Sequence, residues 1–242
     1  MALQRSQMAD KNIVDRTNAR RNSEVAKAVR RTRERLAQRV GSPDFDRELL
    51  KLHARAVINS AIAIPVLVVV ICAIGLLAGV GQEIAIWAVI AVTGYVGLAL
   101  FAKRTAEAEV GDIKPAATRR NFLIGHFLSG LGWGYFAMLG CGECEPGQFT
   151  TVKAVVLLLA IAATALTTSA LRGALIVTFA LPVAVFALAA ARLWMPVEGL
   201  MAALLVASLP FFTYVAGHMH PSALMFLSFR TEKDALIAEL ET

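Results

Sequence analysis

The stretch VINSAIAIPVLVVVICAIGLLAGV, residues 57–80, is the first of six apolar runs that follow one another between Val57 and Gly217. The runs are 18 to 24 residues long. Because the hydrocarbon core of a bilayer is about 30 Å thick, roughly 20 apolar residues of α-helix are enough to cross it. The sequence therefore predicts an all-α polytopic membrane protein with six transmembrane helices.

The six runs divide the chain into three parts. We expect a basic cytoplasmic helical arm over residues 1–56, a transmembrane domain over 57–217 and a cytoplasmic coiled-coil helix over 218–242. The expected spans are 57–80, 84–102, 122–141, 154–171, 173–191 and 197–217.

Glycines and prolines inside the spans indicate how the helices pack. Gly75 and Gly79 are four residues apart, as are Gly130 and Gly134, and this spacing lets two membrane helices approach closely. Kinks are expected at three prolines inside the spans, Pro65, Pro182 and Pro210.

The composition supports a membrane location, and the charge is concentrated near the N-terminus. The chain is 57% hydrophobic and 17% charged. Residues 1–56 hold 14 of the 24 Lys and Arg residues against 7 acids. A basic arm beside a membrane predicts anionic lipid headgroups as partners, and not nucleic acid. The first apolar run begins only after this long polar segment, which fits a signal-anchor span and no cleavable signal peptide.

The distribution of cations between the loops predicts the orientation. If residues 1–56 are cytoplasmic, 22 of the 24 cationic residues fall on the cytoplasmic side, and only Lys153 and Arg192 fall in external loops. This agrees with the positive-inside rule. We therefore expect a multi-pass protein of the bacterial inner membrane with both termini in the cytoplasm. The cytoplasmic loop cations are Lys103, Arg104, Lys114, Arg119, Arg120 and Arg172.

Hydroxyl groups are concentrated in the fourth expected span. Thr164, Thr167, Thr168 and Ser169 are typical of residues that bond their own helix carbonyls or a neighbouring helix. The alternative is a polar site for a small ligand, with Thr164 and Thr168 as intramembrane sensing residues.

His126 is a second candidate for intramembrane sensing. An ionisable residue inside a span indicates function by default, so a pH- or ligand-sensing role stands beside interfacial packing. His218 and His220 end the sixth expected span, and together with His126 they offer imidazoles for a haem or a metal as an alternative role. No second histidine sits within an expected span, so we predict no cofactor and no metal ligand.

Two of the three cysteines form a Cys-x-x-Cys pair at the external end of the third expected span. Cys141 and Cys144 are expected either to form a structural disulfide, to remain idle thiols or to act as a redox pair. Cys72 lies in the middle of the first span and is interpreted as a small apolar residue.

No catalytic constellation is visible in the sequence. It has no glycine-rich phosphate loop, no paired carboxylates within a span and no nucleophile with a plausible base. We predict no catalytic residue, and whether the protein is an enzyme stays open.

Both flanks of the spans carry helical patterns. Residues 13–40 predict a basic, weakly amphipathic helix, with a mobile charged arm as the alternative. Ser42 and Pro43 are a good cap and first-turn pair. After them Phe45, Leu49, Leu52 and Ala56 follow at helical spacing.

The C-terminal flank predicts a dimer seam. Phe226, Phe229, Lys233, Leu236 and Leu240 are spaced 3, 4, 3 and 4 residues apart, as in a two-stranded coiled coil. We therefore expect a homodimer, although an ordinary amphipathic surface helix would show a similar pattern over so short a length.

Two of these flanking segments carry a resemblance to a known family. The tail FRTEKDALIAELE, residues 229–241, resembles the connector between a multispan membrane region and the catalytic part of bacterial sensor histidine kinases and some diguanylate cyclases. The segment FDRELL, residues 45–50, is similar to the corresponding segment of alphaproteobacterial PAS-containing and hybrid sensor kinases.

The resemblance implies the sensory and anchor portion of a two-component histidine kinase. The chain has no phosphoacceptor histidine box, no ATP-binding boxes and no GGDEF sequence, so the output domain is expected outside this chain. A cytoplasmic response regulator would then be the partner of the parent kinase. The alternatives are a free-standing membrane scaffold or localisation protein, and the input module of a diguanylate cyclase.

Overall fold

The computed structural model describes residues 43–141, 146–193 and 196–240, with side chains described as far as His218, and every regular element in these ranges is an α-helix. The helices are α2 (Pro43–Asn59), α3 (Ala63–Leu77), α4 (Glu83–Glu107), α5 (Pro115–Met138), α6 (Pro146–Thr167), α7 (Ala174–Leu193) and α8 (Pro196–Leu240). The predicted all-α fold is confirmed for this part of the chain. The basic helix predicted over residues 13–40 lies outside the described residues.

Prolines mark the start of four of the helices. α2, α5, α6 and α8 begin at Pro43, Pro115, Pro146 and Pro196. The first residues of a helix have no intrahelical acceptor for their N–H groups, so a proline there loses no hydrogen bond and its fixed φ fits the helix. Lys114, which precedes α5, has the extended backbone that a residue before proline prefers.

The first expected span is interrupted near its N-terminal end. α2 ends at Asn59, residues 60–62 form a turn, and α3 resumes at Ala63. Pro65 has no N–H to donate to the carbonyl of Ala61, which accounts for a break at this position. The disruption that Pro65 predicts is thus present, whereas Pro182 lies inside the continuous helix α7.

The second glycine of the Gly75 and Gly79 pair has a different role from the predicted one. Gly79 follows the end of α3 with a φ of 83°. Its N–H donates to the carbonyl of Leu76, and the N–H of Val80 donates to the carbonyl of Gly75. These two bonds form a Schellman motif, which requires a left-handed residue that glycine adopts without strain. The prediction that Gly79 is a packing glycine is therefore wrong.

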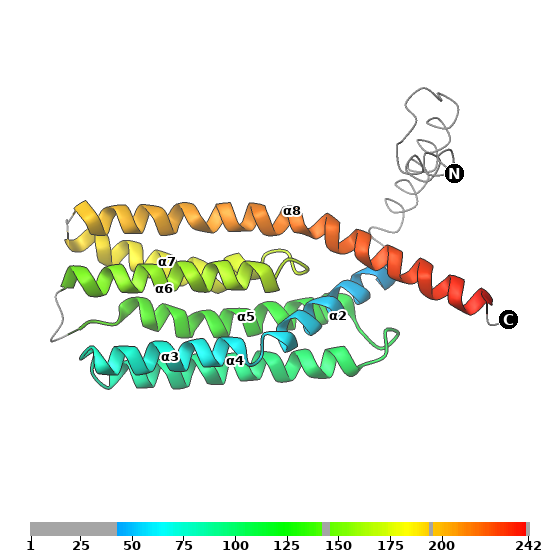
Figure 1. The fold of residues 1–242 in the computed structure, drawn as a ribbon, viewed down its shortest axis with the longest axis horizontal. Coiled ribbons are helices and arrows are strands. Elements are labelled where there is room, and N and C mark those ends of the chain that lie inside the picture. Colours follow the sequence, from blue (N-terminus) through cyan, green and yellow to red (C-terminus); the bar gives the residue numbers. More distant parts are fainter. Residues whose placement is uncertain (1–42, 142–145, 194–195, 241–242) are drawn as a thin grey trace, which may run out of the picture. The chain divides into compact units, whose positions relative to one another are not determined.

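The helices from α3 onward alternate in direction, and α5 is the central one (Figure 1). α5 makes extensive contacts with α4 and α7, α2 packs on α4 and α5, and α8 packs on α6 and α7. A methyl group built on Gly130 would overlap the backbone carbonyl of Thr178 in α7, and one built on Gly134 would touch Leu181. The close approach predicted from Gly130 and Gly134 is therefore confirmed, and it occurs between α5 and α7.

Five helical segments are long and apolar enough to cross a membrane: Phe45–Leu77, Glu83–Glu107, Gly147–Thr167, Ala174–Arg192 and Pro196–His218. Apolar side chains such as Ile62 and Leu77 are exposed over 79% and 90% of their surface. Soluble monomers rarely expose large contiguous apolar patches, so this surface suits lipid. α5 has 24 residues, but with His126 and four glycines it is not among the five.

The buried apolar residues form two clusters within this bundle. One is built around Trp87, Trp133 and Phe179, and the other around Tyr95 and Phe122. Along α5, His126 and Ser129 lie between the two clusters and are both buried. A polar layer therefore separates the two apolar clusters.

Candidate functional site

The polar layer contains a pair of histidines that the sequence did not predict. His53 of α2 is fully buried, and its Nε2 lies 3.1 Å from the Nε2 of His126 in α5. The two ring centroids are 5.3 Å apart, and the rings of His53 and Phe122 are nearly perpendicular, with centroids 4.9 Å apart. The expectation that no second histidine sits within a span is therefore wrong, because the first candidate span, Phe45–Leu77, contains His53.

The neighbours of the pair determine where its protons lie. The hydroxyl of Thr178 donates to the carbonyl of Ala174 at 2.8 Å, so its oxygen can only accept from His126 Nδ1, 3.3 Å away. His126 then carries its proton on Nδ1, and its Nε2 accepts a hydrogen bond from the Nε2–H of His53. We call the chain His53, His126 and Thr178 the histidine relay.

The relay has one unsatisfied atom. With its proton on Nε2, His53 has a lone pair on Nδ1, and this buried nitrogen has no hydrogen bond of good geometry. The backbone of Thr167, at the end of α6, interacts with the same ring. The relay thus joins α2, α5 and α7 by hydrogen bonds, and the ring of His53 also meets the backbone at the end of α6.

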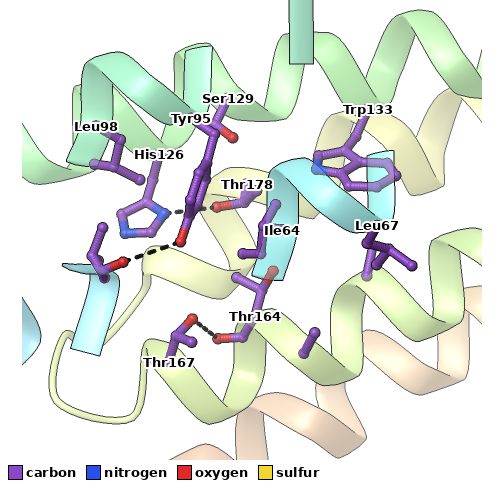
Figure 2. Close-up of a pocket in the computed structure, with 13 residues that line it drawn as sticks. Ile64, Leu67, Tyr95, Leu98, His126, Ser129, Trp133, Thr164, Thr167 and Thr178 are labelled. Atoms are coloured by element: carbon purple, nitrogen blue, oxygen red, sulfur yellow. Dashed lines mark hydrogen bonds between the residues drawn. The ribbon is translucent and has the colours of Figure 1, made fainter. Parts of the chain in front are cut away.

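A small cavity lies beside the relay (Figure 2). Its volume is about 30 Å³, enough for about one or two water molecules. Its polar lining includes His126, Tyr95, Ser129, Thr164 and Thr167. A cavity of this size beside polar side chains suits one or two bridging waters.

A second set of hydrogen bonds fixes the break between α2 and α3 next to this cavity. The hydroxyl of Ser60 lies 2.5 Å from that of Tyr95 in α4, and it also donates to the carbonyls of Ala56 and Val57. The backbone N–H of Ser60 also donates to the carbonyl of Ala56, so Ser60 ends α2 with both its backbone and its side chain. The turn at 60–62 is therefore a defined structure, tied to α4.

The hydroxyls predicted as a sensing group in the fourth span are divided between two places. Thr167 and Thr168 both donate to the carbonyl of Thr164, and Ser169 donates to that of Leu166. This is the backbone-bonding role that the sequence favoured. Thr164 and Thr167 also line the cavity beside the relay, whereas Thr168 lines a different cavity at the α6–α7 turn. Thr164 and Thr168 therefore do not share one site.

The relay does not fit a haem. A cavity of about 30 Å³ is far below the several hundred Å³ typical of cofactor pockets, and the two imidazoles touch each other directly. Within the described ranges, no group of three His, Cys, Asp or Glu side chains is placed to hold a metal ion.

The predicted cysteine pair is only partly described. Cys141 is disulfide-bonded, and Cys72 is a free thiol. Cys144, the remaining cysteine of the sequence, lies outside the described residues. The sulfur of Cys141 is 3.7 Å from the carbonyl of Gly79, so this cysteine packs against the turn that ends α3.

The sequence predicted Lys153 in an external loop, but the structure places it elsewhere. It lies within α6, is 8% exposed, and donates to the carbonyls of Ala137 and Leu139 at the C-terminal end of α5. Glu198, in the first turn of α8, interacts electrostatically with it and is also buried. A lysine bonded to the last carbonyls of a helix stabilises that helix end. The expected span 154–171 therefore begins too late, because α6 starts at Pro146.

The coiled-coil seam of the tail is described only by its backbone. α8 continues as one helix through Leu240, but the side chains of Phe226, Phe229, Leu236 and Leu240 lie outside the described residues. The seam and the dimer stay predictions.

His53 was missed because it precedes the first apolar run. The sequence singled out Phe45, Leu49, Leu52 and Ala56, but these four are only partly buried. The buried stripe of α2 is Leu50, His53, Ala54 and Val57, with the spacing i, i+3, i+4, i+7 of an amphipathic helix. That pattern was present in the sequence and would have placed His53 toward the core.

Comparison with known proteins gives no relative. No protein-family model matches this chain, and neither a curated protein nor a solved structure matches it.

Proposed function

We propose that this chain is the membrane-embedded input module of a two-component signalling protein, and that α8 carries a change in helix packing to a cytoplasmic output domain. The length of α8 carries the proposal. Its 45 residues make a helix of about 67 Å at 1.5 Å per residue, more than twice the hydrocarbon thickness of about 30 Å. A single helix can therefore pack in the bundle and also project from the bilayer.

The proposed membrane topology has six spans and two cytoplasmic termini. α5 is the sixth span, and its lower hydropathy fits its central position, where glycines contact α4 and α7. In this topology the α4–α5 loop and the α6–α7 turn lie at the cytoplasmic end of the bundle, and the cations Lys103, Arg104 and Arg172 fall there. The membrane is then the bacterial inner membrane.

The histidine relay is the proposed switch inside the bundle. It holds α5 to α7 through His126 and Thr178, and α7 packs directly on α8. Packed helices have discrete arrangements, so loss of one buried hydrogen bond can favour another arrangement. A ligand or water that competes for the relay would shift α7, and α8 would follow.

Disulfide cross-linking in membranes tests the signalling helix. Single cysteines at Phe229, Leu236 and Leu240 are placed in a chain whose native cysteines are serine, and Ala238 serves as the off-seam control. Cross-linking at the three seam positions but not at Ala238 is expected of a paired helix. The substitution His126→Leu should change the relative yields among the three positions. Absent cross-links, or equal yields at Ala238, would remove the signalling mechanism and favour a scaffold.

A further inference from the structure

A second cavity lies where α8 passes the turn between α6 and α7. Its volume is about 260 Å³. One wall is the turn itself, residues 168–173, a second is the start of α7, and the third is α8 near Thr213 and Gly217. Both its size and its place distinguish it from the cavity beside the relay.

The polar wall of this cavity is suited to an anion. Arg172 is exposed, and the described residues provide it with no carboxylate partner. The hydroxyls of Thr168, Ser169 and Thr213 donate to backbone carbonyls, so among the described lining residues Arg172 is the side chain with donors left for a ligand. A guanidinium binds phosphate through two parallel hydrogen bonds, which gives both charge and geometry.

The rest of the lining is apolar and open to the outside of the bundle. Ile176 is 44% exposed, whereas Leu175 and Ala216 are buried. A volume of about 260 Å³ is slightly below that of a typical small-molecule pocket, so it would hold a headgroup and not a whole lipid. A cationic group above an apolar groove is the arrangement that a phospholipid complements, with its phosphate in the cavity and its chains along the helices.

We propose that this cavity binds the phosphate headgroup of an anionic phospholipid from the leaflet at the cationic end of the bundle. The lipid would contact the α6–α7 turn and α8 at the same time, near the point where α8 leaves the bundle. The proposal rests on the membrane embedding and not on the signalling role, so it can fail or succeed independently of the cross-linking result.

Native mass spectrometry of the full chain released from nanodiscs tests the site. Nanodiscs contain either phosphatidylglycerol or phosphatidylcholine, and the wild-type chain is expected to retain a phosphatidylglycerol molecule and not a phosphatidylcholine. Arg172→Gln should weaken this retention at least about tenfold, because it removes a charge-assisted phosphate contact. The matched control is Arg192→Gln, an exposed arginine near the other end of α7, which should retain the lipid as the wild type does.

A second variant keeps the test decisive if Arg172→Gln does not fold. A Cβ atom on Gly217 meets no atom within 4 Å, so Gly217→Leu is tolerated by its neighbours while its side chain fills the cavity. It should lose the bound lipid with an unchanged circular dichroism spectrum. Excess glycerol phosphate should not displace the lipid, since a headgroup without chains gains no apolar contact; displacement would mean a free-phosphate site. Equal retention by wild type, Arg172→Gln and Gly217→Leu, or equal retention of both lipids, would overturn the proposal.

Discussion

The histidine relay can be measured with a double-mutant cycle on His53 and His126. Replacing His126 with leucine removes its two hydrogen bonds and leaves the Nε2–H of fully buried His53 without an acceptor. An unsatisfied buried donor costs about 1–3 kcal/mol, so His126→Leu should lower the free energy of unfolding by about that amount. His53→Leu should cost a similar amount, because it also removes the edge contact with Phe122, worth about 0.5–1.5 kcal/mol.

The double variant should cost less than the sum of the two single ones. With both imidazoles gone, no unpaired nitrogen remains between α2 and α5. Hydrogen bonds between membrane helices measured in this way average about 0.6 kcal/mol and reach about 1.7 kcal/mol, and the short direct contact predicts a coupling in that range.

Unfolding by sodium dodecyl sulfate in mixed micelles, followed by tryptophan fluorescence, is a suitable assay because Trp87 and Trp133 are buried in the bundle. The control cycle pairs His53 with exposed His218, for which the two costs should add. If the costs of His53→Leu and His126→Leu add within about 0.3 kcal/mol, the relay does not exist as described.

Two further substitutions test the packing around the relay. Gly130→Ala should separate α5 from α7 and lower the free energy of unfolding by about 1–3 kcal/mol in the same assay, since its methyl group meets a backbone carbonyl. The control Gly97→Ala meets no atom within 4 Å and should be neutral or stabilising by up to about 1 kcal/mol. An equal effect of the two substitutions would contradict the packing of α5 on α7. Lys153→Met should lower the free energy of unfolding by about 1.5–3 kcal/mol, because two helix-end carbonyls lose a charged donor. Lys103 is exposed and has only a surface ion pair, so the control Lys103→Met should change stability by less than about 0.5 kcal/mol. If Lys153→Met left the stability unchanged, these hydrogen bonds would not stabilise the fold.

Hydropathy predicted the helices well but not their ends. A run of about 20 apolar residues is a strong signal because lipid requires the backbone to be hydrogen-bonded within each segment. The predicted positions of the ends are wrong where polar residues are buried and make specific contacts. The predicted span 154–171 starts directly after Lys153, yet the carbonyls of Ala137 and Leu139 accept hydrogen bonds from this lysine inside the bundle. A window average registers the charge of such a residue and not its partners.

The site was only half visible for a related reason. His126 stood out because it interrupts an apolar run, whereas His53 lies among Lys51 and Arg55, where a histidine attracts no notice. The sequence spacing between the two histidines contains no information about their contact, since it depends on how α2 packs against α5. Such a tertiary pairing needs the fold.

The break at Pro65 connects this fold to the site. α3 packs on α4, whereas α2, before the break, packs on both α4 and α5. Pro65 has no N–H to donate to the carbonyl of Ala61, so the helix is interrupted at 60–62. As a result α2 follows a different path from α3 (Figure 1). This change of path is what brings His53 to α5. The proline that would weaken an isolated transmembrane helix therefore stands at the change of direction beyond which His53 contacts His126.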